Sequence, residues 1–166
     1  MIMKSIHLSK LNNLALQEQR IKFPSVPDHC RAMPSYKDNS ANYLTKSVIK
    51  FIQLTGGQAE RISVQGQFKD NRKIVIDSMG FKKTIGSTQF IKSSMTKGSA
   101  DISASITPLG GTYAASVKIE IKQKDKQSEF QKLYEQSIDL AGGVYIIVRS
   151  FDEFYEWWSE FTGKAI

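Results

Sequence analysis

Two short stretches separated by a turn carry the clearest hydrophobic pattern of this chain. The second stretch alternates three apolar residues with three charged ones, in the order Val117, Lys118, Ile119, Glu120, Ile121 and Lys122. This period of two predicts a strand with one apolar and one charged face. The first stretch, residues 98–102, contains Asp101, and the pair Gly110-Gly111 between them predicts an antiparallel hairpin. A turn centred on that pair sets Asp101 opposite Glu120.

The N-terminal part predicts two helices with an extended segment between them. Residues 5–22 are loosely amphipathic, which is typical of a helix lying on the domain or on a partner subunit. Residues 23–39 contain three prolines and are expected to form an extended arm. Residues 40–55 repeat apolar residues at helical spacing, with Asn39 or Ser40 as N-cap, and are expected to form the first core helix.

Two β elements and a basic insertion are expected next. Residues 58–68 predict a strand at one edge of the sheet, and residues 73–85 predict a hairpin around Ser78-Met79-Gly80. Residues 69–97 form an insertion that is rich in basic residues: Lys69, Arg72, Lys73, Lys82, Lys83, Lys92 and Lys97. This run is either a solvated loop or a surface for a phosphate backbone, to which Lys124 would also belong.

The C-terminal part predicts a helix, a strand and a second helix. The first helix opens at Asp125 or Ser128, and its buried stripe is expected to consist of Phe130, Leu133, Tyr134 and Ile138. Residues 144–148 form a continuous apolar run, typical of a strand covered on both faces and reached by a parallel crossover. A capping-box pattern at Ser150 starts the last helix, whose aromatic residues are expected to seal the sheet rather than stack on bases. The predicted fold is an α/β sandwich with a mixed central sheet.

Composition adds constraints on the partner and the compartment. The chain has 166 residues, of which 23 are Lys or Arg and 16 are Asp or Glu, so its net charge of +7 favours a polyanionic partner such as nucleic acid. The single cysteine, Cys30, excludes an internal disulfide and suits a reducing cytoplasm. No signal peptide and no membrane span are expected. Residues 28–30 are not expected to bind a metal, because adjacent side chains point in different directions.

The charged face of the predicted hairpin suggests metal chemistry. Two carboxylates brought together at Asp101 and Glu120 repel each other, and a cation such as Mg²⁺ or Mn²⁺ relieves that repulsion. The backbone carbonyl of Ile121 is a further candidate ligand, and Lys122 could orient an attacking water. The alternative from alternation alone is a solvated strand face with ion pairs across the hairpin.

These residues resemble the VRR-NUC family of the PD-(D/E)xK nuclease superfamily. The likeness rests on Gly98-x-x-Asp101, Glu120-Ile121-Lys122, a helix carrying Gln131, and Gly143-x-Tyr145-x-x-Val148-Arg149-Ser150, and it spans roughly residues 40–160. The resemblance implies a restriction endonuclease-like αβββαβ domain at residues 40–166, preceded by an N-terminal helix and extended arm at residues 1–39. It also implies Mg²⁺- or Mn²⁺-dependent cleavage of branched or Holliday-junction DNA to 5′-phosphate and 3′-hydroxyl ends. The expected protein is a homodimer in the cytoplasm of a bacterial host, of bacterial or phage origin.

The resemblance also assigns roles to single residues. Asp101 and Glu120 become metal ligands, Lys122 serves the attacking water, and Gln131 lies beside the site. For Gln131 a capping box with Ser128 is an equal alternative. The family's glutamate on the first core helix is replaced, with Asn42 as the expected equivalent position, so the number of metal ions stays open. Arg61 resembles the family's arginine after the first strand and is expected to contact the scissile strand.

The leading hypothesis is therefore a metal-dependent DNA endonuclease. A non-catalytic nucleic-acid-binding or assembly protein on a degenerate nuclease fold is the alternative, which the missing helix glutamate keeps open. A nuclease acting on RNA is a third reading. These readings differ in whether a divalent ion supports cleavage, and of which nucleic acid.

Overall fold

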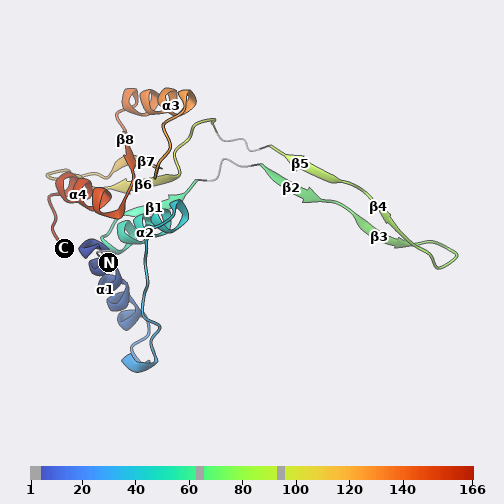
Figure 1. Cartoon of the computed structure of the whole chain (residues 1–166), viewed down its shortest axis with the longest axis horizontal. Helices are drawn as coiled ribbons and strands as arrows, with labels where there is room; N and C mark the ends of the chain where they lie inside the picture. The colour runs from blue at the N-terminus through green and yellow to red at the C-terminus, as the bar shows by residue number, and fades with distance from the viewer. Residues whose placement is uncertain (1–4, 63–65, 93–95) are drawn as a thin grey trace. The chain divides into compact units, whose positions relative to one another are not determined.

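The computed structural model describes residues 5–62, 66–92 and 96–166 and is of the mixed α/β class (Figure 1). Two compact units make up the chain. One unit combines Met1–Ile62 with Gly98–Ile166, and the other is Ser63–Lys97. The larger unit contains the four α-helices and a four-stranded sheet, whereas the smaller unit consists of paired strands alone within its described residues.

The sheet of the larger unit is mixed, as the sequence predicts. Its strands are β1 (Gln58–Arg61), β6 (Ile102–Ile106), β7 (Ala115–Ile121) and β8 (Val144–Val148), in that spatial order. The pairs β1–β6 and β6–β7 are antiparallel, and β7–β8 is parallel. The parallel connection runs through α3 (Glu129–Leu140), which confirms the predicted strand–helix–strand crossover.

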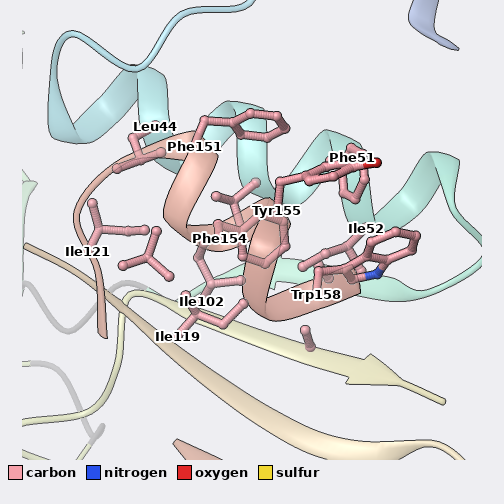
Figure 2. Close-up of a cluster of buried hydrophobic side chains, with 14 of the residues drawn as sticks. Leu44, Phe51, Ile52, Ile102, Ile119, Ile121, Phe151, Phe154, Tyr155 and Trp158 are labelled. Atoms are coloured by element: carbon pink, nitrogen blue, oxygen red, sulfur yellow. The ribbon is translucent and has the colours of Figure 1, made fainter. Parts of the chain in front are cut away.

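One face of the sheet packs against α2 (Ala41–Leu54) and α4 (Phe151–Thr162). Residues of even number on β6 and odd number on β7 point to this face, and they are buried: Ile102, Ala104, Ile106, Val117, Ile119 and Ile121. Figure 2 shows aromatic side chains of α4 packed beside α2 and the sheet. The ring of Phe51 contacts four of them: Phe151, Phe154, Tyr155 and Trp158. The ring of Phe51 meets Trp158 edge-on, with centroids 4.8 Å apart. The expectation that the last helix seals the sheet is confirmed.

The N-terminal helix belongs to the same core. Helix α1 (Ile6–Lys22) buries Leu8 and Leu11, and it contacts both α2 and α4. Its N-cap Ser5 and the imidazole of His7 both contact the carboxylate of Asp152 at the start of α4. The arm that follows is interrupted by a turn at residues 24–26 and by a single turn of 3-10 helix, η1 (Asp28–Cys30). Within the described residues, no helix is both long and apolar enough to cross a membrane.

Helix α3 covers the opposite face of the sheet, and two predictions about its surroundings are wrong. Of the four residues expected in a buried stripe, Phe130 and Leu133 are 55% and 62% exposed, and Tyr134 and Ile138 are only partly buried. The reason is that α3 lies over the edge strand β8, so that only one narrow side of the helix meets the sheet. Because β8 is an edge strand, its apolar run is not fully covered either, and Ile146 and Ile147 stay partly exposed.

The strand predicted at residues 58–68 is not one strand. Its first part is β1, an edge strand as expected, which ends at Arg61. Its central part, residues 63–65, lies outside the described residues. Its last part begins another strand, β2 (Gln67–Asp70), which pairs with β5 (Thr88–Ile91). The reason is that β6 begins at Ile102, the partner of Arg61, and offers no partner strand beyond it.

The smaller unit is a long two-stranded hairpin. Beyond β2 and β5, its inner strands are β3 (Lys73–Ile76) and β4 (Lys82–Ile85), which confirm the hairpin predicted at residues 73–85. A backbone bond of 3.2 Å from Asn71 to Ser87 joins the two ladders. At the tip, Asp77 accepts the amide N–H groups of Met79 and Phe81, and Gly80 has a φ of +84°. An aspartate before a glycine of positive φ is the turn chemistry of a short hairpin loop.

Candidate metal and catalytic centre

The hairpin of β6 and β7 sets Asp101 beside Glu120. The ladder pairs Ile102 with Ile119, so the next position outward sets Asp101 against Glu120, as the turn at Gly110-Gly111 predicts. The carboxylate of Asp101 accepts the backbone N–H of Ile121 at 2.9 Å. Asp101 itself lies just before β6, and its carbonyl accepts the N–H of Ile62 at 2.8 Å. Two backbone bonds to neighbouring chain segments therefore fix the position of Asp101.

Glu120 is an almost completely buried carboxylate. Its side chain lies on the α3 face of the sheet, since its neighbours Ile119 and Ile121 point into the core. Oxygen Oε1 accepts from Gln131 and lies 3.3 Å from the Nζ of Lys122. Oxygen Oε2 is buried and has no hydrogen-bond partner among the described residues. Since a buried polar atom without a partner is costly, this oxygen is suited to an additional ligand.

The surroundings of Glu120 disfavour its negative charge. Burial, with the nearby charge of Asp101, raises the pKa of Glu120 from 4.5 to about 7, although Lys122 acts in the opposite direction. At neutral pH a large share of the protein therefore carries Glu120 as the neutral acid. A divalent cation at this position would displace the proton, because metal ligands bind in the deprotonated form.

Gln131 completes a capping box and also contacts Glu120. Its side-chain oxygen accepts the backbone N–H of Ser128 at 2.8 Å, and Ser128 in turn accepts the N–H of Gln131, which completes a capping box. The nitrogen of the same amide donates to Glu120. One side chain thus fixes the start of α3 and connects that helix to the carboxylate on β7.

Gly98 allows the approach of the Asp101 loop to α3. Its φ is +82°, a conformation that other residues rarely adopt. A β-carbon at residue 98 would lie 2.4 Å from the carbonyl oxygen of Phe130 and 2.8 Å from the nitrogen of Gln131. Any side chain here would therefore push the loop away from the first turn of α3.

Tyr145 is a neighbour of the carboxylates to which sequence reasoning gave no role. It is buried on β8, and its hydroxyl has no hydrogen-bond partner among the described residues. Burial and the charge of Glu120 raise the pKa of Tyr145, which keeps the phenol neutral. The continuous apolar run of residues 144–148 hides the alternation that would have set Tyr145 on the face of Glu120.

Asn42 and Arg61 contact each other rather than the carboxylates. The guanidinium of Arg61 donates to the side-chain oxygen of Asn42 at 3.0 Å. Arg61 pairs with Ile102, whose side chain points into the core, so Arg61 leaves the sheet on the α2 side. Within the described residues, no side-chain hydrogen bond joins either residue to Asp101 or Glu120. Their accessory role stays a prediction.

The predicted basic surface divides between the two units. The smaller unit contains Lys69, Arg72, Lys73, Lys82, Lys83 and Lys97, whereas Lys124 is an exposed residue of the larger unit between β7 and α3. Arg72 is held by Asp70 through two bonds of 2.8 and 2.9 Å. This ion pair neutralises one of the predicted phosphate contacts.

The donor set fits one hard divalent cation. The two carboxylates of Asp101 and Glu120, the latter with its unpartnered oxygen Oε2, offer the oxygen ligands that Mg²⁺ and Mn²⁺ prefer. A cluster of three or more His, Cys, Asp or Glu is not found among residues 5–62, 66–92 and 96–166. Water or a backbone carbonyl, such as the predicted one of Ile121, would have to complete the coordination. No family model matches this chain, and neither a curated protein nor a solved structure is detectably similar to it.

Proposed function

We propose that this chain is a Mg²⁺- or Mn²⁺-dependent endonuclease with a restriction endonuclease-like core, acting on branched DNA. The observation that carries the proposal is Glu120, a buried carboxylate beside Asp101 with one unpartnered oxygen and with Lys122 at 3.3 Å. Burying a carboxylate in this way is costly for a purely structural strand. Perturbed carboxylates of this kind are concentrated at functional sites.

Each residue of the proposed site has a separate task. Asp101 and Glu120 would hold the ion, which polarises a phosphate oxygen and lowers the pKa of a bound water. Lys122 would orient the attacking water and offset the charge of the phosphate. Gln131 would fix the orientation of the Glu120 carboxylate through its hydrogen bond. The sheet and α3 surround this centre with backbone that is already in place, which lowers the cost of reorganisation.

The test compares cleavage and binding in single variants. Asp101→Asn, Glu120→Gln and Lys122→Met are each expected to lower cleavage of a four-way junction in Mg²⁺ by about a hundredfold or more, while junction binding in EDTA is retained. Lys118→Met is the matched control, because Lys118 lies on the same strand and face but donates to Ser103 at 2.6 Å. Mn²⁺ binding measured by electron paramagnetic resonance gives a second readout, lost in Asp101→Asn and Glu120→Gln only. Cleavage by Glu120→Gln at the wild-type rate would refute the proposal.

A specific observation favours the non-catalytic alternative. Asn42, at the position expected for a helix glutamate, accepts a hydrogen bond from Arg61 and makes none to the carboxylates. The alternative predicts junction binding that weakens with salt, without cleavage in any divalent ion. Matched DNA and RNA junctions in the same assay would also separate a DNA nuclease from an RNA nuclease.

We further propose that the protein is a homodimer that associates through α3. Phe130, Leu133 and Leu140 lie on one side of this helix, and all three are more than half exposed. Contiguous exposed apolar side chains of this kind are typical of protein interfaces. A dimer would place two metal centres on one branched substrate.

A further inference from the structure

The hairpin of residues 67–91 contains many apolar side chains that its own fold does not bury. Every residue from 67 to 92 is exposed, and the exposed set includes nine large apolar side chains: Phe68, Ile74, Val75, Ile76, Met79, Phe81, Ile85, Phe90 and Ile91. A two-stranded hairpin alone in water is marginally stable at best. A contact partner is therefore expected to cover part of this surface.

The charge of the smaller unit identifies the chemistry of that partner. Residues 63–97 contain seven Lys or Arg and two Asp, so this fifth of the chain holds five of the seven net positive charges. Of the two acids, Asp70 is paired with Arg72, and Asp77 is used by the turn at the tip. The exposed side chains of Lys69, Lys73, Lys82 and Lys83 are complementary to a polyanion rather than to a neutral surface.

The register divides the cations between the two faces. Lys69 opposes Gln89, Lys73 opposes Ile85 and Lys83 opposes Val75, and the backbone bond from Asn71 to Ser87 keeps the same register between the two ladders. Opposed residues share a face, so Lys69, Lys73 and Lys83 lie on one face of the ribbon. The other face contains Lys82, opposite Ile76, together with the ring pair Phe68–Phe90 and the Asp70–Arg72 ion pair. We call the first face, defined by Lys69, Lys73 and Lys83, the lysine face.

We propose that this hairpin is a DNA-binding β-ribbon that lies in a groove of duplex DNA with its lysine face toward the phosphates. The eleven residues from Gln67 to Asp77 span about 35 Å as extended chain, close to one turn of B-DNA. A groove of duplex DNA admits a two-stranded ribbon of this kind. Met79 and Phe81 at the tip, 80% and 67% exposed, are apolar wedges suited to a base step.

This inference rests on the proposed function, because it takes the polyanion to be the DNA substrate. The hairpin would hold a duplex arm of the branched substrate, and the centre at Glu120 would cut the backbone. Binding and cleavage would then be separable by mutation. Loss of cleavage in a Glu120 variant tests the centre, and loss of binding in a hairpin variant tests the ribbon.

The experiment measures equilibrium binding of full-length protein to a fluorescent duplex and to a four-way junction in EDTA. The triple variant Lys69→Gln/Lys73→Gln/Lys83→Gln is expected to weaken binding by on the order of tenfold or more, and to lower the slope of log K against log salt by about 2.7. The triple variant Lys37→Gln/Lys46→Gln/Lys164→Gln removes the same charge from exposed sites of the larger unit. It is expected to leave the slope close to that of the wild type.

A second control removes a pair that the proposal treats as neutral. Asp70→Asn/Arg72→Gln deletes the ion pair and is expected to bind as the wild type does. Equal losses in the two lysine triples, or no loss in the Lys69/Lys73/Lys83 triple, would overturn the proposal. The proposal would also be overturned if Phe68→Ser/Ile74→Ser changed the sedimentation mass of the protein and left DNA binding unchanged. That result would show that the ribbon binds a second copy of the chain.

Discussion

Replacing Glu120 by glutamine tests the electrostatics of the centre without any substrate. In the folded protein the pKa of Glu120 is about 7, against 4.5 ordinarily. Between these two values the unfolded chain is ionised while the folded protein holds a proton. The contribution of the Glu120 proton to the unfolding free energy is therefore fully present below pH 4.5 and is lost as the pH rises through 7. The difference of about 2.5 pKa units corresponds to about 3 kcal/mol of unfolding free energy.

The assay is urea unfolding in EDTA, followed by tryptophan fluorescence, at several pH values from 4 to 9. Trp158 lies in the core and reports the loss of packing. At each pH the unfolding free energy of Glu120→Gln is subtracted from that of the wild type, which cancels the contributions of the other ionisable groups. This difference should fall by about 1.4 kcal/mol per pH unit between pH 4.5 and 7, and then level off.

Lys122→Met provides the matched comparison for this experiment. It removes the cation that lowers the pKa of Glu120, so the levelling-off should move to higher pH. Added Mg²⁺ should restore stability to the wild type at pH 8 and not to Glu120→Gln, because a ligand that binds only the folded state stabilises it. A difference between wild type and Glu120→Gln that does not change with pH would refute the argument.

Two further predictions concern α3. Ser128→Ala and Gln131→Ala both remove the capping box, and each should lower the unfolding free energy by about 1 kcal/mol. Only Gln131→Ala also removes the hydrogen bond to Glu120, so only this variant should lower cleavage and shift the pH dependence of the cleavage rate. Equal cleavage by both variants would leave Gln131 as a helix cap alone. Leu133→Glu should convert a dimer to a monomer, as measured by analytical ultracentrifugation. The control Tyr113→Glu changes an exposed residue outside α3 and should leave the mass unchanged. An unchanged mass for Leu133→Glu would contradict an interface on α3.

Local patterns were enough to predict the centre of the sheet. The glycine pair at residues 110–111 and the alternation around Glu120 determine the register that brings Asp101 to the ladder end. A hairpin with a short turn has few alternative registers, and slipping by one residue would expose the apolar face. The apolar spacing of residues 40–55 and of the last helix similarly predicted the core.

Patterns that depend on distant partners were not predictable in the same way. The apolar residues of α3 read as a core stripe, but the sheet ends at β8 and leaves Phe130 and Leu133 exposed. The alternation of residues 58–68 continued across two strands that have different partners, β6 and β5. The contact of Arg61 with Asn42 needed the three-dimensional arrangement of β1 and α2. The sequence predicted the hairpin at residues 73–85, but not its extension by the pairing of β2 with β5.

The side-chain amide of Gln131 makes two hydrogen bonds, one to Ser128 and one to Glu120, and together they constrain how this position can change in evolution. A capping box accepts glutamine and glutamate equally well, so the helix alone would let either residue stand after Ser128. A glutamate would bring a third carboxylate against Glu120, whereas the amide presents a donor to it. Among relatives of this chain, glutamine at this position is then expected wherever the proposed metal centre is kept, and glutamate only where the helix is kept without it.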